Sequence, residues 1–277
     1  MLRFLCLLSV FMTAFLPIAA YGAVPAVEPE MPSSLSDDEL AEIVDFVVGN
    51  AVFTLYHQAG HMMAVRYGDG PDDERHADRF AAITLLEPRS GAGDQTLVDA
   101  IDSYRLAAHQ QDGDSGLPMP APDGHALDAA RAEAIACDMI GADPVGFADV
   151  AEAMALSRDK RSACQASWRA DLAAWRDSLR AIRRADSAPG SALPVAYDPP
   201  VDQDVAEATI LQDNHVLEEV AAKLGATYDF ASPPTVRAMH CGEATSRFDA
   251  IRNELVLCYE LSARHGQLIL RDIESRG

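Results

Sequence analysis

The chain reads His57-Gln58-Ala59-Gly60-His61 within an otherwise apolar, helix-forming stretch. An α-helix turns about 100° per residue, so side chains four positions apart lie on the same face. Two imidazoles on one helical face can direct their ring nitrogens to one point, which is typical of metal ligands. We therefore expect this helix to carry a site and to be one of two helices at the core of the fold.

A second helix, predicted over residues 74–86, supplies further candidate ligands. Glu74 lies in its first turn and offers a third ligand, because catalytic zinc sites use three protein ligands and keep one open position. Asp78 lies one turn later, on the face of Glu74 and on an otherwise apolar stripe, so it needs a polar partner if buried. The second ring nitrogen of His57 or of His61 is a natural partner. His76 is the competing third ligand, but it should face away from Glu74, and we interpret it as a surface residue.

The set His57, His61 and Glu74, with Asp78 behind it, predicts a Zn²⁺ site. The alternative is that both histidines are ordinary residues of an amphipathic helix in a structural protein without metal. The zinc-hydrolase pattern His-Glu-x-x-His carries a glutamate at its second position, where this chain has Gln58. The predicted metal ligands are therefore complete, whereas the residue expected to handle protons is replaced by a neutral amide.

The N-terminus has the features of a secretory signal peptide over residues 1–23. Arg3 precedes an apolar run over residues 4–20, and small residues suitable for cleavage follow. The alternative is an uncleaved membrane anchor, but the run is short for a span and Pro17 interrupts it. We therefore expect an exported protein, periplasmic or extracellular, with no stable membrane span after cleavage.

The charge balance limits the classes of partner. The chain has 22 Lys+Arg and 43 Asp+Glu, a formal net charge of −21. A field of this sign repels phosphate backbones, so we expect no nucleic-acid partner.

Four cysteines remain once the predicted signal peptide is removed, and an even number in an exported chain indicates disulfides. Three pairings are possible. The local one fits the predicted elements best and joins Cys137 to Cys164 and Cys241 to Cys258. A four-cysteine zinc site is disfavoured, because no Cys-x-x-Cys spacing occurs.

Apolar periodicity predicts a mainly α protein with a small C-terminal β element. A capping box at Ser36 starts the first helix, and Gly49-Asn50 suggests a stop or kink before the histidine helix. We expect a helical metal-site domain over residues 24–184 and a Pro-rich linker or surface loop over 185–204. Residues 205–277 should add a helix and a β-like run at 254–259, which can pair with 236–241 and pack on the same domain.

Several segments together resemble a family of exported bacterial proteins assigned as zinc metallopeptidases and catalogued as a domain of unknown function. The resemblance rests on residues 49–61 and 73–81, on residues 125–144 with His125, Arg131 and Cys137, and on residues 241–244 and 257–261. It implies a zincin-like site that acts on peptides or proteins, with His57, His61 and Glu74 as ligands and Asp78 supporting them.

Gln58 is where the chain departs from that family pattern. In such sites the glutamate accepts a proton from water and passes it to the leaving amine, a contribution of about 10²–10⁴-fold in rate. Glutamine cannot accept that proton. The two resulting hypotheses are an attenuated or inactive peptidase and a zinc-holding pseudopeptidase that binds peptides or proteins. His125 could donate a hydrogen bond to an oxyanion, or it could be a surface histidine at a helix end.

Overall fold

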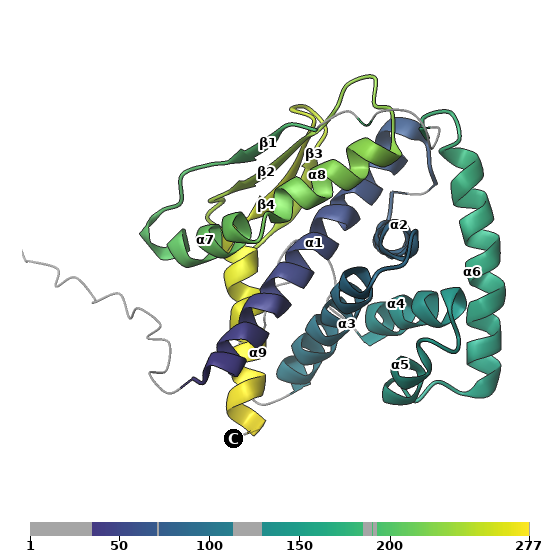
Figure 1. The fold of residues 1–277 in the computed structure, drawn as a ribbon, viewed down its shortest axis with the longest axis horizontal. Coiled ribbons are helices and arrows are strands. Elements are labelled where there is room, and N and C mark those ends of the chain that lie inside the picture. Colours follow the sequence, from purple (N-terminus) through teal and green to yellow (C-terminus); the bar gives the residue numbers. More distant parts are fainter. Residues whose placement is uncertain (1–34, 71, 113–128, 185–189, 191–192, 277) are drawn as a thin grey trace, which may run out of the picture. The chain divides into compact units, whose positions relative to one another are not determined.

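The computed structural model describes residues 35–70, 72–112, 129–184, 190 and 193–276 (Figure 1). Residues Ser36–Gly277 form one compact unit. The predicted signal peptide lies outside the described residues. The elements in chain order are α1 (Asp37–Tyr67), α2 (Glu74–Leu86), α3 (Gly91–Asp112), α4 (Ala129–Ala142), α5 (Ala148–Ala153), α6 (Arg158–Ser178), β1 (Val195–Tyr197), a 3₁₀ turn (Asp202–Asp204), α7 (Val205–Asp213), α8 (Val216–Thr227), β2 (Thr235–Met239), β3 (Ser246–Asp249), β4 (Glu254–Cys258) and α9 (Tyr259–Arg276).

Helix α1 is one continuous helix, so the predicted interruption at Gly49-Asn50 is wrong. Asn50 donates hydrogen bonds from its side chain to Phe46 O on its own helix and to Asp99 O on α3. A Cβ atom at Gly49 would lie 2.0 Å from Asp99 Oδ2, so glycine here lets α3 approach α1. Gly49 and Asn50, a pair that often ends a helix, instead allow α3 to pack closely against α1. The helix does begin with the predicted capping box at Ser36.

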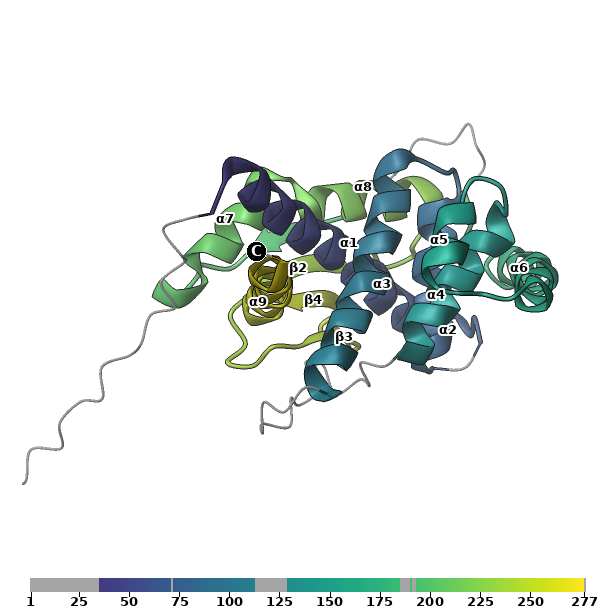
Figure 2. The same ribbon diagram turned by 90° about the horizontal axis from the view of Figure 1, so that it is seen from below.

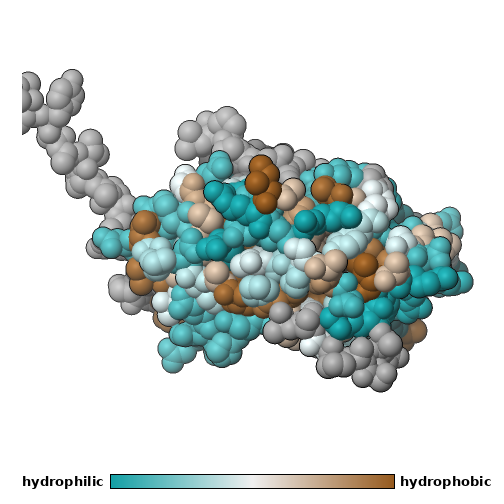
Figure 3. Space-filling model, turned by 90° about the horizontal axis from the view of Figure 1, so that it is seen from above, coloured by the Kyte–Doolittle hydropathy of each residue, from teal (hydrophilic) through white to brown (hydrophobic). Residues whose placement is uncertain are grey.

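The central position belongs to α1, which contacts α2, α3, α8, α9 and strands β3 and β4 (Figures 1 and 2). It is also the one helix among the described residues that is long and apolar enough to cross a membrane, and most of that apolar stretch is buried inside the protein. Its apolar length is therefore explained by its place in the core. The face drawn in Figure 3 is mostly hydrophilic, with apolar residues in small scattered groups.

The C-terminal part carries a four-stranded sheet in the order β1-β2-β4-β3. The predicted pairing of residues 236–241 with 254–259 is confirmed: β2 and β4 are parallel, with Val236 opposite Leu255. Edge strand β3 is antiparallel to β4 and was not predicted. The other edge, β1, pairs in parallel with β2 inside the predicted linker, so that stretch is not wholly a loop.

Two cysteine pairs lie at disulfide distance, in the predicted local pairing. Cys137 of α4 joins Cys164 of α6, and Cys241 joins Cys258 at the end of β4. The first bond fixes α6 to α4. The second closes the segment that contains the antiparallel strands β3 and β4. The mainly α fold with a small C-terminal sheet is thus confirmed.

Candidate metal centre

His57, His61 and Glu74 come together between α1 and α2, with one ligating atom of each within 4.8 Å of the others. The Nε2 atoms of the two histidines are 3.1 Å apart. Glu74 Oε2 is 3.4 Å from His57 Nε2, and Glu74 Oε1 is 3.5 Å from His61 Nε2. His57 is buried, whereas the side chains of His61 and Glu74 are partly accessible, at 14% and 33% exposure. The site therefore opens toward solvent on one side.

Gly60 and Ala77 explain how the two helices come close enough to share this site. A Cβ atom at Gly60 would lie 2.7 Å from Ala77 Cα and 3.0 Å from its carbonyl oxygen, closer than real side chains allow. The glycine within the histidine segment is thus a packing residue. It sets the distance over which Glu74, in the first turn of α2, can reach both imidazoles.

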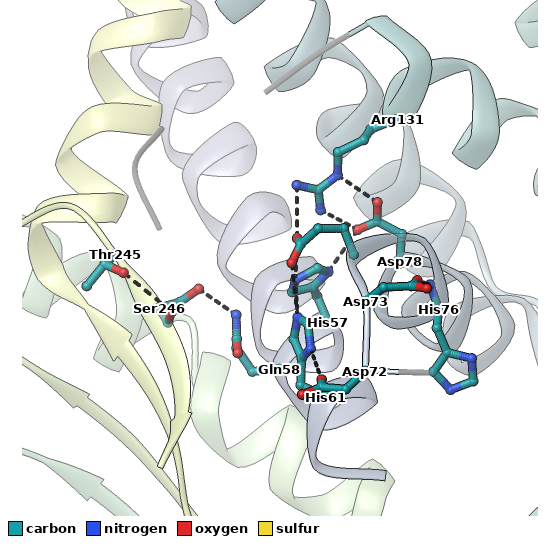
Figure 4. Close-up of polar contacts among 11 residues, drawn as sticks. His57, Gln58, His61, Asp72, Asp73, His76, Asp78, Arg131, Thr245 and Ser246 are labelled. Atoms are coloured by element: carbon teal, nitrogen blue, oxygen red, sulfur yellow. Dashed lines mark hydrogen bonds and ion pairs between the residues drawn. The ribbon is translucent and has the colours of Figure 1, made fainter. Parts of the chain in front are cut away.

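A carboxylate holds the Nδ1 atom of each histidine. Asp78 Oδ1 is 2.8 Å from His57 Nδ1, and Asp72 Oδ1 is 2.6 Å from His61 Nδ1 (Figure 4). A carboxylate accepts hydrogen bonds, so each Nδ1 carries a proton, and Nε2 is the ring nitrogen that is left for a metal. The sequence left open which histidine Asp78 serves, and the structure places it at His57. Asp72 was not predicted from the sequence as the partner of His61. Its position just before Asp73, the N-cap of α2, is only a weak indication of that role.

Arg131 of α4 organises the other side of the site. Its Nε donates to Asp78 Oδ2 at 2.8 Å, its Nη2 donates to Asp78 Oδ1 at 2.6 Å, and its Nη1 lies 3.3 Å from Glu74 Oε2. The guanidinium also lies 4.5 Å from the centre of the Tyr104 ring, a cation–π arrangement. Residue-by-residue reasoning gave this arginine no role, because only tertiary packing brings α4 against α2.

These contacts shift the protonation of the site. Burial lowers the pKa of His57, but its hydrogen bonds with Asp78 and Glu74 outweigh that effect and raise the pKa to about 9. Burial raises the pKa of Asp78, and the contacts with His57 and Arg131 overcome it, leaving the pKa below its usual value. The Asp78 carboxylate is therefore ionised, and it orients the His57 ring by accepting a hydrogen bond from Nδ1.

The donor set fits a divalent cation. With both Nδ1 atoms protonated, two imidazole lone pairs and a carboxylate converge within 4.8 Å, and acceptors placed this way repel one another. A shared positive charge relieves that repulsion. In the chain alone a proton on His57 can do so, consistent with its raised pKa. A metal held by His57, His61 and Glu74 would replace it.

Gln58 points away from the two histidines toward the sheet (Figure 4). Its side chain is buried, with the residue 1% exposed, and its Nε2 donates to Ser246 Oγ of β3 at 2.9 Å. The amide therefore links α1 to the edge strand. His125, the other predicted catalytic residue, lies outside the described residues.

Asp204, His240 and Glu260 form another group with metal-ligand chemistry, where the 3₁₀ turn, the C-terminal end of β2 and the start of α9 meet. His240 Nδ1 lies 2.6 Å from Asp204 Oδ2 and 2.9 Å from Glu260 Oε1. Glu260 Oε1 also accepts a hydrogen bond from Cys241 N at 3.0 Å. These groups already satisfy one another, which indicates a structural network beside the Cys241–Cys258 bond.

The fold and the site define a helical protein with a candidate metal centre shared by two adjacent helices. Residues 27–179, more than half of the chain, match a family described as "Putative metallopeptidase". The chain therefore belongs to that family, which itself suggests a bound metal. The matched range contains both metal-site helices and Arg131, whereas Ser246 lies beyond it. No curated protein and no solved structure matches the chain.

Proposed function

We propose that this chain is a secreted or periplasmic zinc metallopeptidase of zincin-like type in which Gln58 attenuates hydrolysis. One observation carries the proposal. Two imidazole Nε2 atoms and the Glu74 carboxylate converge, and a separate carboxylate contacts the Nδ1 atom of each imidazole, which leaves Nε2 for a metal.

The ligand types favour zinc. Two imidazole nitrogens and one carboxylate oxygen form a ligand set common in catalytic zinc sites, which keep a fourth position open. Zinc held there would supply Lewis acidity toward a carbonyl and lower the pKa of a water molecule. The chain's own residues would orient the ligands: Asp78 and Asp72 fix the imidazoles, and Arg131 holds Asp78 and Glu74 together.

Gln58 limits the proton chemistry. A carboxylate at this position could accept a proton, whereas an amide cannot, and general-base assistance is worth about 10²–10⁴-fold in rate. The Gln58 amide is also engaged with Ser246, on the side away from the histidines. We therefore expect slow hydrolysis at most.

The same hydrogen bond favours a second candidate, a zinc-holding pseudopeptidase that binds peptides or proteins without cutting them. A buried amide bonded to the edge strand has a structural role that does not depend on turnover. Export is supported by the signal-like N-terminus and by the two disulfide pairs.

The test begins with elemental analysis of the purified mature protein. We expect about one zinc per chain, and we expect Glu74→Ala to lose it. Hydrolysis of a peptide library is then measured with and without chelator, for the natural protein and for Gln58→Glu. Chelator-sensitive activity that rises by about 10²–10⁴-fold in Gln58→Glu supports the attenuated peptidase. Zinc and peptide binding without turnover in either protein favours the pseudopeptidase, and absence of metal refutes both.

A further inference from the structure

A cavity of 520 Å³ lies between α2, α6 and the connection from α1 to α2. Its position differs from that of the candidate metal centre, because His76 lines it and points away from His57 and Arg131 (Figure 4). The interpretation of His76 as a plain surface residue was therefore incomplete, since its side chain is only 20% exposed. Cavities of about 300–1,000 Å³ are typical of small-molecule sites.

A buried carboxylate lines this cavity. Asp69 is 4% exposed, and its Oδ1 accepts a hydrogen bond from Ser178 of α6. Its Oδ2 lies 3.4 Å from His76 Nε2, an ion-pair distance without a hydrogen bond between them, and neither atom has another hydrogen-bond partner in the described structure. Buried polar groups without a partner are costly, so both atoms are suited to a ligand that supplies hydrogen-bond donors and positive charge.

A residue that lines the same cavity carries a buried donor. Trp175 is 7% exposed and lines the cavity, and its Nε1 has no hydrogen-bond partner among the residues that the structure covers. A buried indole N–H normally finds an acceptor. The two features together suit a ligand that offers both a donor and an acceptor.

Two arginines line the cavity, and one of them can pair with a negative charge on the ligand. Arg79 is already paired with Asp138 and Asp171. Arg75 is exposed, lines the cavity and forms no ion pair with any residue in the described ranges. It can therefore meet an anionic group. Phe80 and Ile83 supply an apolar wall.

Gly70 leaves room for the His76 ring at the wall of the cavity. Its φ of +118° lies in the region that favours glycine, and a Cβ atom there would lie 2.7 Å from His76 Cε1. Glycine at this position therefore leaves the imidazole in place beside Asp69.

We propose that this cavity is a binding site for a small zwitterion, a free α-amino acid or dipeptide with an apolar side chain. Its ammonium group binds Asp69 and His76, its carboxylate binds Arg75 and the Trp175 N–H, and its side chain packs on Phe80. This site goes beyond the proposed peptidase function and does not depend on metal.

The test is calorimetric titration of the mature protein with L-leucine and with the dipeptide Leu-Gly, before and after chelator treatment. N-acetyl-L-leucine lacks the ammonium group and L-leucinamide lacks the carboxylate. Each analogue should therefore bind at least about tenfold more weakly than L-leucine. Binding should survive the chelator, which separates this cavity from the metal centre. Trp175 fluorescence should change on binding.

Asp69→Asn and Arg75→Gln should each weaken L-leucine binding by about tenfold, because each removes one charge partner. Arg75 is exposed, so Arg75→Gln should fold normally. This variant therefore tests the proposal even if Asp69→Asn does not fold. Arg252→Gln, at an exposed arginine away from the cavity, is the matched control and should bind as the natural protein does. Equal binding of N-acetyl-L-leucine, unchanged binding by Arg75→Gln, or no saturable heat up to about 10 mM ligand overturns the proposal.

Discussion

Arg131 and Asp78 form a buried two-bonded ion pair that connects α4 to α2 behind the candidate metal centre. The contacts are 2.8 Å from Nε to Oδ2 and 2.6 Å from Nη2 to Oδ1. Asp78 Oδ1 also contacts His57 Nδ1 at 2.8 Å, so the ion pair helps to fix the orientation of the imidazole. One carboxylate therefore couples the bundle's packing to the orientation of a candidate ligand.

Asp78→Asn should weaken metal binding by about 10–100-fold, because the partner that orients a histidine ligand is lost. It should also lower the free energy of unfolding by about 3–5 kcal/mol, since Arg131 loses its main buried counter-charge. Competition with a zinc indicator measures the first effect and urea denaturation the second. Asp72→Asn is the matched control for stability alone, because it also contacts a histidine ligand but its side chain is 54% exposed, so its stability loss should stay within about 1 kcal/mol. Equal stability losses in the two variants would contradict this assignment.

Ser246→Ala should destabilise the fold by about 1–3 kcal/mol, because the Gln58 amide would be left buried without its acceptor. Metal content should not change, since Ser246 touches none of the candidate ligands in the described contacts. Denaturation midpoints and elemental analysis of the same preparation check both expectations. Loss of metal on this substitution would show that β3 shapes the metal centre more directly than the geometry indicates.

Gly60→Ala should separate α1 from α2, because the new methyl group meets the Ala77 backbone, which cannot rotate away. We expect a loss of about 1–3 kcal/mol in stability together with weaker metal binding. Gly91→Ala, at the start of α3, has open space around its Cβ position and should change stability by less than about 0.5 kcal/mol. If Gly60→Ala binds zinc as tightly as the natural protein, the close approach of the helices is not what builds the site.

Asp99 should make stability depend on pH. Burial raises its pKa from 3.8 to about 6, with Asp102 and Asp45 adding to the shift and the hydrogen bond from Gln95 opposing it. The folded protein holds this proton more tightly than the unfolded chain. The stabilisation is therefore present below about pH 4 and is lost as the pH rises through about 6.

Asp99→Asn removes that dependence and keeps the side chain's shape. Relative to the natural protein, it should gain on the order of 2–3 kcal/mol between pH 4 and pH 8. Urea denaturation of both proteins across this range measures the difference, in which contributions of other groups, such as Asp138, cancel. Parallel stability curves would mean that Asp99 does not carry the shift.

Local sequence was enough to predict the elements that build the site. The capping box at Ser36 and the start of α2 at Glu74 are both where short-range rules place them. The four-residue spacing of His57 and His61 set their common face, and cysteine spacing favoured the pairing that the structure has. Each of these signals acts within a few turns of backbone, or over a short loop.

Contacts between distant segments decided the rest. Asp99, far along the chain, explains why α1 runs through Gly49, and Arg131 and Ser246 become partners of Asp78 and Gln58 only when α4 and β3 pack against the first two helices. The helical repeat of the backbone is local, so it predicts from a short stretch of sequence which face of the helix a side chain occupies. Which residue packs against that face depends on packing interactions throughout the core. A short stretch of sequence does not determine those interactions.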